Sequence, residues 1–324
     1  MKNLKYTGAF AAVAVTALTF ATPALAEDAK VTETAYIFNS LSFLIHGFMV
    51  MLMAAGFAML EAGMVRTKNV ATMCVKNIAL YSIAGILYYA VGYNLMYQGV
   101  DGGFMGTFAP WGIDDSAMAK GDFSGNYSAS SDWFFQMVFV ATAASIVSGT
   151  VAERIKLWPF LAFVVVLTGV IYPIQGSWQW GGGWLSEMGF ADFAGSTLVH
   201  STGGWAALTG AIILGARKGK FTKSGGVHPM PGSSLPLATL GTFILWFGWF
   251  GFNGGSQLAM GSASDIAAIA NIYINTNIAA AGGVVAAMIA TQLIYKKVDL
   301  TMALNGALAG LVSITAGPDT PTMG

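Results

Sequence analysis

The chain contains repeated apolar runs, each long enough to cross a membrane, and this pattern constrains its fold more than any other feature. A spanning α-helix needs about 20 apolar residues to cross roughly 30 Å of hydrocarbon. Of the 324 residues, 55% are hydrophobic and 9% are charged, which excludes a disordered chain, a coiled coil and an ordinary cytosolic enzyme. We therefore predict an all-α, polytopic membrane protein. The predicted spans cover residues 36–64, 76–99, 132–152, 157–175, 193–215, 235–257, 268–295 and 300–316.

The first 26 residues have the pattern of a secretory signal peptide. Lys2 and Lys5 precede an apolar stretch that ends in the sequence TPALA at residues 22–26. This is a basic region, a hydrophobic region and a small-residue cleavage site. We expect cleavage after Ala26, so that residues 27–324 form the membrane domain and begin outside the cytoplasm. An uncleaved first helix is the alternative.

Basic residues are distributed unevenly among the segments between the predicted spans. With the mature N-terminus outside, eleven lysines and arginines fall on the cytoplasmic side and two fall outside, as the positive-inside rule requires. The expected location is the cell inner membrane. The inner residues are Arg66, Lys68, Lys76, Arg154, Lys156, Arg217, Lys218, Lys220, Lys223, Lys296 and Lys297, and the outer ones are Lys30 and Lys120.

The longest outer connection, about residues 100–131, contains four aspartates among glycine, serine and aromatic residues. Such a segment either concentrates cations weakly at the outer face or is simply a solvated loop. The aspartates are Asp101, Asp114, Asp115 and Asp122.

Two short stretches suggest an internal repeat. Residues 56–63 (GFAMLEAG) in the first span can be aligned with residues 248–255 (GWFGFNGG) in the sixth. Since these spans start on opposite sides of the membrane, a true match predicts an inverted repeat of five helices, as in many transporters. A chance match in a glycine-rich chain is the alternative.

With the signal and the loops set aside, four ionisable side chains are candidates for membrane depth, where burying such a group is expensive. Asp192 precedes a span and is placed to cap its N-terminus, and His200 lies eight residues later, about 12 Å deeper. An imidazole near the bilayer midplane must face a pore or a partner, and the residues around His200 favour a pore role over a core histidine. Glu61, close to Arg66, is interpreted as a packing or snorkelling group. His46 has no evident partner and is interpreted as structural.

Aromatic residues predict a site for a small cation. Phe135 and Phe139 share one helix face, as do Phe252 and Ser256, because each pair is four residues apart. Trp178, Trp180 and Trp184 follow the fourth span. A tryptophan there is usually a membrane anchor. However, aromatic faces also bind cations, and a hydroxyl can accept their N–H bonds.

Four motifs together resemble the ammonium transporter (Amt/Mep/Rh) family, in its Amt branch. The most specific is ADFAGSTLVHSTGG at residues 191–204, which resembles the fifth-helix signature. The others are GFAMLEAGMVRTKN at residues 56–69, AERI at residues 152–155 and GWFGFNGGS at residues 248–256. They occur in the family's order along the whole mature chain. The resemblance implies an eleven-helix fold built as an inverted five-plus-five repeat, of which about eight helices are present.

The resemblance also assigns functional residues. It makes Phe139, Trp180 and Ser256 the outer ammonium-binding site, with Phe135 nearby. Phe139 and Phe252 become two stacked gating rings. Asp192 matches the structural and electrostatic carboxylate beside the site, and His200 matches the first of two hydrogen-bonded pore histidines. On this hypothesis ammonium loses its proton near the gating rings, ammonia crosses an apolar lumen, and the histidine pair orders it or relays the proton.

The chain departs from the family at its C-terminal end. The second pore histidine should stand on a tenth helix, which this sequence does not reach, so we expect an incomplete polypeptide whose parent transports. The resemblance implies a homotrimer in the lipid bilayer and, in bacteria, a PII signalling protein as partner. The expected absence of the cytoplasmic tail weakens the PII expectation.

Other functions remain as alternatives. An ammonium sensor would carry a kinase or cyclase extension after residue 324, and a carrier of another small amine or a gas channel of the Rh branch would share the fold. No enzyme is expected, because metal-hydrolase and serine-nucleophile motifs are absent from the sequence. We expect no cofactor, no metal and no nucleic acid.

Overall fold

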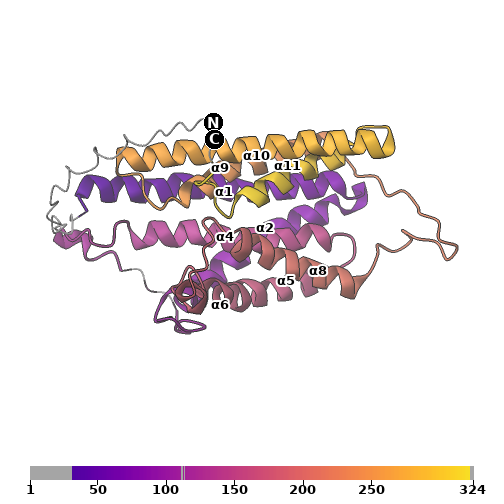
Figure 1. The fold of residues 1–324 in the computed structure, drawn as a ribbon. Coiled ribbons are helices and arrows are strands. Elements are labelled where there is room, and N and C mark those ends of the chain that lie inside the picture. Colours follow the sequence, from indigo (N-terminus) through magenta and orange to yellow (C-terminus); the bar gives the residue numbers. More distant parts are fainter. Residues whose placement is uncertain (1–30, 111, 113, 322–324) are drawn as a thin grey trace, which may run out of the picture. The chain divides into compact units, whose positions relative to one another are not determined.

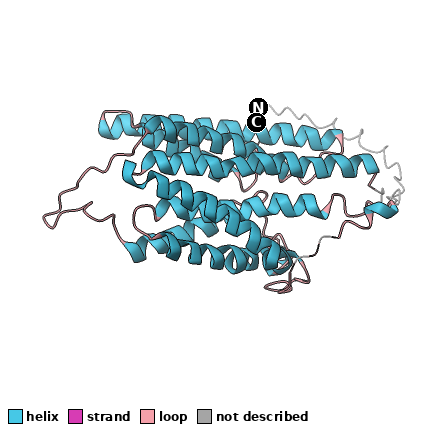
Figure 2. Cartoon of the chain, turned by 180° about the vertical axis from the view of Figure 1, so that it is seen from behind, coloured by secondary structure: helices cyan, strands magenta, loops and turns pink. Residues whose placement is uncertain are grey.

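The computed structural model describes residues 31–110, 112 and 114–321. The predicted signal peptide lies outside these residues. The regular structure of the described part is helical (Figure 2), apart from a single isolated β-bridge between Phe221 and Val227. The all-α prediction is therefore confirmed.

Seven of the described helices, some of them composite, are long and apolar enough to cross a membrane. Three contain π-helical segments (η2, η4 and η5), and one begins with a 3-10 turn (η1). The spans are α1 (Glu33–Met64), η1–α2–η2–α3 (Thr67–Asn69, Val70–Leu87, Tyr88–Gly92, Tyr93–Tyr97), α4 (Ala129–Thr150), α5–η4–α6 (Leu157–Val166, Leu167–Ile171, Tyr172–Ser177), η5–α8 (Ser196–Ser201, Thr202–Leu214), α9 (Leu235–Gly255) and α10 (Ala263–Tyr295). The connections contain η3 (Met118–Lys120) and α7 (Trp184–Glu187).

The eighth predicted span corresponds to a shorter helix. Helix α11 covers Leu300–Ile314, which is 15 residues or about 22 Å at 1.5 Å per residue. This is less than the thickness of the hydrocarbon layer. The chain leaves the helix at Thr315 and turns through Pro318, so α11 ends within the bundle.

Side-chain caps fix where five of the described helices begin. In each case a hydroxyl or carboxylate oxygen accepts a backbone N–H of the first turn, which would otherwise lack a partner. At α10 the cap is reciprocal, because Asp265 also accepts from the backbone of Ser262. The capping residues are Thr32 for α1, Ser128 for α4, Ser234 for α9, Ser262 for α10 and Asp299 for α11.

Helices α1 and α9 pack closely along one another and run antiparallel (Figure 1). A Cβ at Gly63 would lie 2.6 Å from the backbone N of Ala238, and a Cβ at Gly251 would lie 2.6 Å from the carbonyl O of His46. Glycine is therefore needed for this approach. The antiparallel contact is the geometry that an inverted repeat requires, and the repeat itself remains a prediction.

Candidate functional site

Two pockets lie on either side of a buried aromatic core. The first, called here the aromatic pocket, has a volume of about 450 Å³ and is lined by Phe135, Phe139, Trp180, Ser256 and several carboxylates. The second, the histidine pocket, has a volume of about 480 Å³ and is lined by His200, Trp249, Glu61 and Arg217. The four residues predicted to form the cation site are thus brought together from α4, α9 and the connection after α6.

Two phenylalanine rings separate these pockets. Phe139 on α4 and Phe252 on α9 are stacked, with ring centroids 4.0 Å apart, and both are buried. The Phe252 ring also contacts the imidazole of His200, with centroids 5.2 Å apart. Phe139 lines the aromatic pocket and His200 lines the histidine pocket, so this stack lies between them.

The polar groups beside the rings suit a ligand that donates hydrogen bonds. Ser256 Oγ donates to the carbonyl O of Phe252 at 2.9 Å, which leaves the oxygen lone pairs free to accept. Trp180 Nε1 donates to the carbonyl O of Asp192 at 2.8 Å, and this bond fixes the indole, whose centroid lies 6.0 Å from that of Phe139.

Asp192 is buried behind the pocket and caps the next span. Its carboxylate accepts four backbone N–H bonds, from Gly195, Ser196, Thr197 and Leu198, at 2.6 to 2.9 Å. These are the free donors at the start of η5. Asp192 is not among the residues that line the aromatic pocket. It therefore acts on a bound cation through its hydrogen bond with Trp180 and through the charge of its own carboxylate.

The end of α11 supports the same segment. The carbonyl oxygens of Thr315 and Ala316 accept the backbone N–H groups of Ala194 and Phe193, at 3.1 and 2.9 Å. The hydroxyl of Thr315 accepts the indole N–H of Trp249 at 2.8 Å. The two residues that follow α11 therefore hold the segment that carries Asp192.

His200 lies in a buried position with one nitrogen committed. Its Nδ1 is 3.1 Å from the carbonyl O of Gly195, and a carbonyl can only accept, so Nδ1 carries the proton and Nε2 is an acceptor. The imidazole stacks on the Trp249 indole at 4.9 Å. Nε2 is buried, with no hydrogen-bond partner within the described part of the chain.

His46 does have partners, contrary to the sequence interpretation. Its Nε2 lies 2.8 Å from the hydroxyl of Tyr273 on α10, and its Nδ1 lies 3.0 Å from Ser42 Oγ. It lines neither pocket. The histidine therefore joins α1 to α10, which is a structural role.

Lys76 was predicted to lie in a cytoplasmic loop, and this is wrong. It lies within α2, fully buried, with Nζ 3.6 Å from Glu61 Oε2 and 2.6 Å from the carbonyl O of Ser148. Glu61 also accepts from Ser148 Oγ at 2.7 Å. The Lys76 ammonium is retained among apolar helices because it pairs with this carboxylate and lies 5.0 Å from the Phe160 ring.

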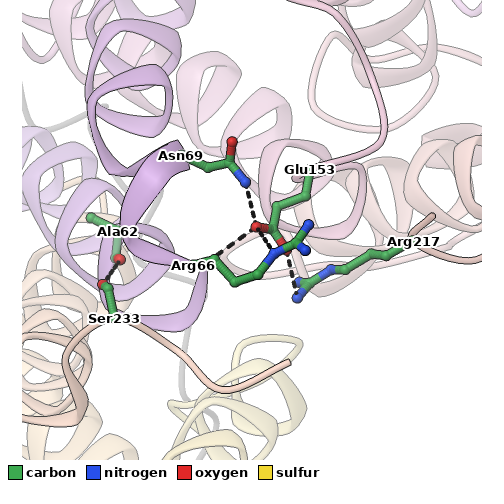
Figure 3. A network of polar contacts seen from close by, with 6 residues as sticks. All are labelled: Ala62, Arg66, Asn69, Glu153, Arg217 and Ser233. Carbon is green, nitrogen blue, oxygen red and sulfur yellow. Dashed lines mark hydrogen bonds and ion pairs between the residues drawn. The ribbon is translucent and has the colours of Figure 1, made fainter. Parts of the chain in front are cut away.

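Arg66, the neighbour expected for Glu61, instead joins a second network (Figure 3). Glu153 Oε1 accepts from Arg66 Nε at 2.9 Å and from the Asn69 amide, while its Oε2 lies 3.0 Å from Arg217 Nη1. Burial disfavours the charged form of Glu153. The hydrogen bonds from Arg66 and Asn69 and the charge of Arg217 outweigh this, so the pKa falls below its ordinary value of 4.5.

Sequence reasoning missed one buried carboxylate in the aromatic pocket. Asp132 lies in the first turn of α4 and lines the pocket with Gln136. It was overlooked because residue 132 was taken as the boundary of a span. The available signal was its spacing, since residues 132, 135, 136 and 139 fall on one helix face.

The comparisons with known proteins agree with the sequence resemblance. The profile of the Ammonium Transporter Family matches residues 41–323. The ammonium transporter Amt2 of Archaeoglobus fulgidus is 47% identical over 84% of this chain, and a putative ammonium transporter of Synechocystis is 43% identical over 91%. A solved structure titled "Sensor Amt Protein" superposes with a TM-score of 0.80 and 38% identity, covering 89% of this chain and 70% of that one.

The chain is shorter than these curated relatives. It spans 58% of the length of the Archaeoglobus protein and 66% of the Synechocystis protein.

Proposed function

The chain belongs to the ammonium transporter family, and on that premise we propose that it moves ammonium across a membrane as neutral ammonia. The observation that carries the proposal is the closed Phe139–Phe252 stack between a pocket suited to cations and a pocket that contains an imidazole. Moving a charge through such an apolar region costs several kcal/mol. A neutral molecule avoids that cost.

Recruitment takes place in the aromatic pocket. Ammonium is a cation with four N–H donors, so the faces of Phe135, Phe139 and Trp180 attract its charge and the free lone pairs of Ser256 accept one of its hydrogen bonds. Potassium has a similar size but no donors. The hydroxyl therefore favours ammonium.

Ammonium gives its proton to water in the aromatic pocket, beside the ring stack, and neutral ammonia then passes. Displacement of the Phe139 and Phe252 rings opens a path to His200, whose Nε2 lone pair accepts a hydrogen bond from ammonia or a proton. The apolar surroundings disfavour any cation at this point. The carboxylate of Asp192 fixes the start of η5, which borders this path.

The location and assembly follow from the charge pattern and the family. We place the protein in the cell inner membrane with the aromatic pocket and the mature N-terminus outside, because the basic loops lie at the other end. We also propose a homotrimer, and a PII signalling protein as a cytoplasmic partner of the protein's natural full length.

Uptake of labelled methylammonium into vesicles tests transport directly. The protein, in its full natural length, is reconstituted and supplied with methylammonium at fixed pH, with and without excess ammonium or potassium. We expect uptake that ammonium suppresses and potassium does not. Protein-free vesicles are the negative control. Phe160→Ala, which replaces a buried phenylalanine outside both pockets, is the control for the general effect of a substitution. Uptake no faster than in protein-free vesicles contradicts the proposal.

An ammonium sensor is the second candidate, favoured by the similarity to the structure titled as a sensor. A sensor needs the aromatic pocket but no flux. Ammonium binding by the purified protein without uptake in vesicles, together with a signalling domain encoded after residue 324, would support this function over transport.

A further inference from the structure

The aromatic pocket contains a buried carboxylate that has no basic partner. Asp132 is 7% exposed and lies in the first turn of α4. Its Oδ2 accepts the hydroxyl hydrogen of Tyr93 on α3, and its Oδ1 accepts from Gln136 Nε2 at 3.3 Å. Both donors are neutral. No ion pair to Asp132 occurs among the residues that the structure describes.

The other buried carboxylates are compensated differently. Glu61 pairs with Lys76, and Glu153 pairs with Arg66 and Arg217. Asp192 accepts four N–H bonds at a helix N-terminus. A buried carboxylate with only two neutral donors lacks such compensation, so the charge of Asp132 calls for a cation from outside the chain.

The pocket in front of Asp132 favours cations throughout. Its lining contains four aspartates, and none of the described residues that line it is basic. Asp115 is engaged at the start of α4, where it accepts from the backbone N of Ala129 at 2.7 Å, and Asp114 accepts from the backbone N of Ser116 at 3.0 Å. Asp132 is the most deeply buried of the four.

The carboxylate also lies on the route to the rings. Asp132, Phe135 and Phe139 are separated by three and four residues, so they follow one face of α4 from its loop end inwards. A cation that enters from the loop side therefore passes the carboxylate before it reaches the Phe139–Phe252 stack.

We propose that Asp132 holds the substrate cation in the aromatic pocket. Its carboxylate is the counter-ion of a monovalent, hydrogen-bond-donating cation of ammonium size, which rests against the faces of Phe135 and Phe139. Gln136, which donates to Oδ1, is the positioning residue that orients the carboxylate, whereas the Tyr93 hydroxyl ties it to α3. This inference rests on the proposed function, because it deepens the role of the same pocket.

The rival role is a tether between α3 and α4 through Tyr93, and two variants separate the roles. Asp132→Asn removes the charge but retains an oxygen that accepts from Tyr93. Tyr93→Phe removes the tether but retains the carboxylate. Holding a cation requires the charge, whereas tethering requires the hydroxyl.

The experiment measures the methylammonium concentration that gives half-maximal uptake, using the natural full-length protein in vesicles. We expect Asp132→Asn to raise this concentration about tenfold with a maximal rate within about twofold of wild type. We expect Tyr93→Phe to leave the concentration within about twofold, and Asp132→Glu to recover part of the loss. Asp132→Thr replaces Asp132→Asn if the latter does not fold.

The proposal is overturned if Asp132→Asn has the same half-maximal methylammonium concentration as wild type. It is also overturned if Tyr93→Phe raises this concentration as much as Asp132→Asn does. Calorimetric titration of the same detergent-solubilised proteins with ammonium keeps this test separate from the transport proposal. If wild type shows no uptake, transport fails. Weaker ammonium binding by Asp132→Asn than by Tyr93→Phe would still support the role of Asp132, and equal binding would refute it.

Discussion

The ring of Phe139 lies face to face with that of Phe252, at a centroid distance of 4.0 Å and an interplanar angle of 29°. The two residues are contributed by α4 and α9, which are far apart in sequence. Their contact closes the space between the two pockets, so whatever passes from one to the other must displace at least one ring.

Phe252→Ala should open this barrier. Removing the ring joins the two pockets, and we expect potassium to enter vesicles that exclude it when wild type is present. Phe160→Ala is the matched control, because it also removes a buried ring. Both variants should lose about 3–5 kcal/mol of stability, but only Phe252→Ala should leak. Potassium exclusion retained in Phe252→Ala would show that the stack is not the barrier.

His200→Ala should change selectivity or ammonium-dependent current without loss of assembly. The change removes the buried Nε2 acceptor from the histidine pocket. His46→Ala is the control, since His46 binds Tyr273 and lines neither pocket. We expect His46→Ala to lower thermal stability and leave selectivity unchanged. Equal currents in wild type and His200→Ala would remove the relay role.

Asp192→Ala should abolish uptake and destabilise the protein. Four backbone N–H groups lose their acceptor, and each unsatisfied buried donor costs about 1–3 kcal/mol. Asp192→Asn keeps one acceptor oxygen, so its melting temperature should lie between those of Asp192→Ala and wild type. Uptake at the wild-type rate in Asp192→Ala would mean that the cap is dispensable.

The Glu61–Lys76 pair predicts non-additive effects on stability. Lys76→Met leaves a buried carboxylate without its counter-charge, which should cost about 3–5 kcal/mol. The double variant Glu61→Gln with Lys76→Met removes both charges and should recover most of this loss. Unfolding in detergent micelles measures wild type, the two single variants and the double variant. Additive losses would show that the two residues do not interact energetically.

Glu153 predicts a dependence of stability on pH. Its pKa is lowered in the folded protein, so its contribution is complete above the unfolded pKa and is lost as the pH falls through the folded pKa. The stability difference between wild type and Glu153→Gln should therefore be constant from about pH 5 to 8 and shrink below about pH 4.5. A difference that shrinks instead on the alkaline side would contradict this assignment.

Hydropathy predicted most of the fold, because each long apolar run has only one way to satisfy its backbone in lipid, as a helix. Hydropathy did not predict the length of the last helix. Residues 300–316 were predicted as a span, but α11 has 15 residues, and the carbonyls of Thr315 and Ala316, just after it, accept from the N–H groups of Ala194 and Phe193. No local pattern reveals a contact between segments more than a hundred residues apart.

The candidate site shows the same limit. The family resemblance predicted Phe139, Trp180, His200 and Ser256 as site residues, and each of them lines one of the two pockets. Lys76 was misplaced because a lysine normally marks a loop, and only the partner Glu61 explains its burial. Asp132 was missed because its pocket exists only once α3, α4 and α9 have met.

The bonds from Thr315 and Ala316 to the Asp192 segment also bear on how the molecule is made. A nascent chain enters the bilayer from its N-terminal end, so every helix up to α10 is synthesised before these two carbonyls exist. Until they arrive, the backbone N–H groups of Phe193 and Ala194 lack their acceptors. The segment that carries Asp192 should therefore reach its final form only after α11 has been synthesised.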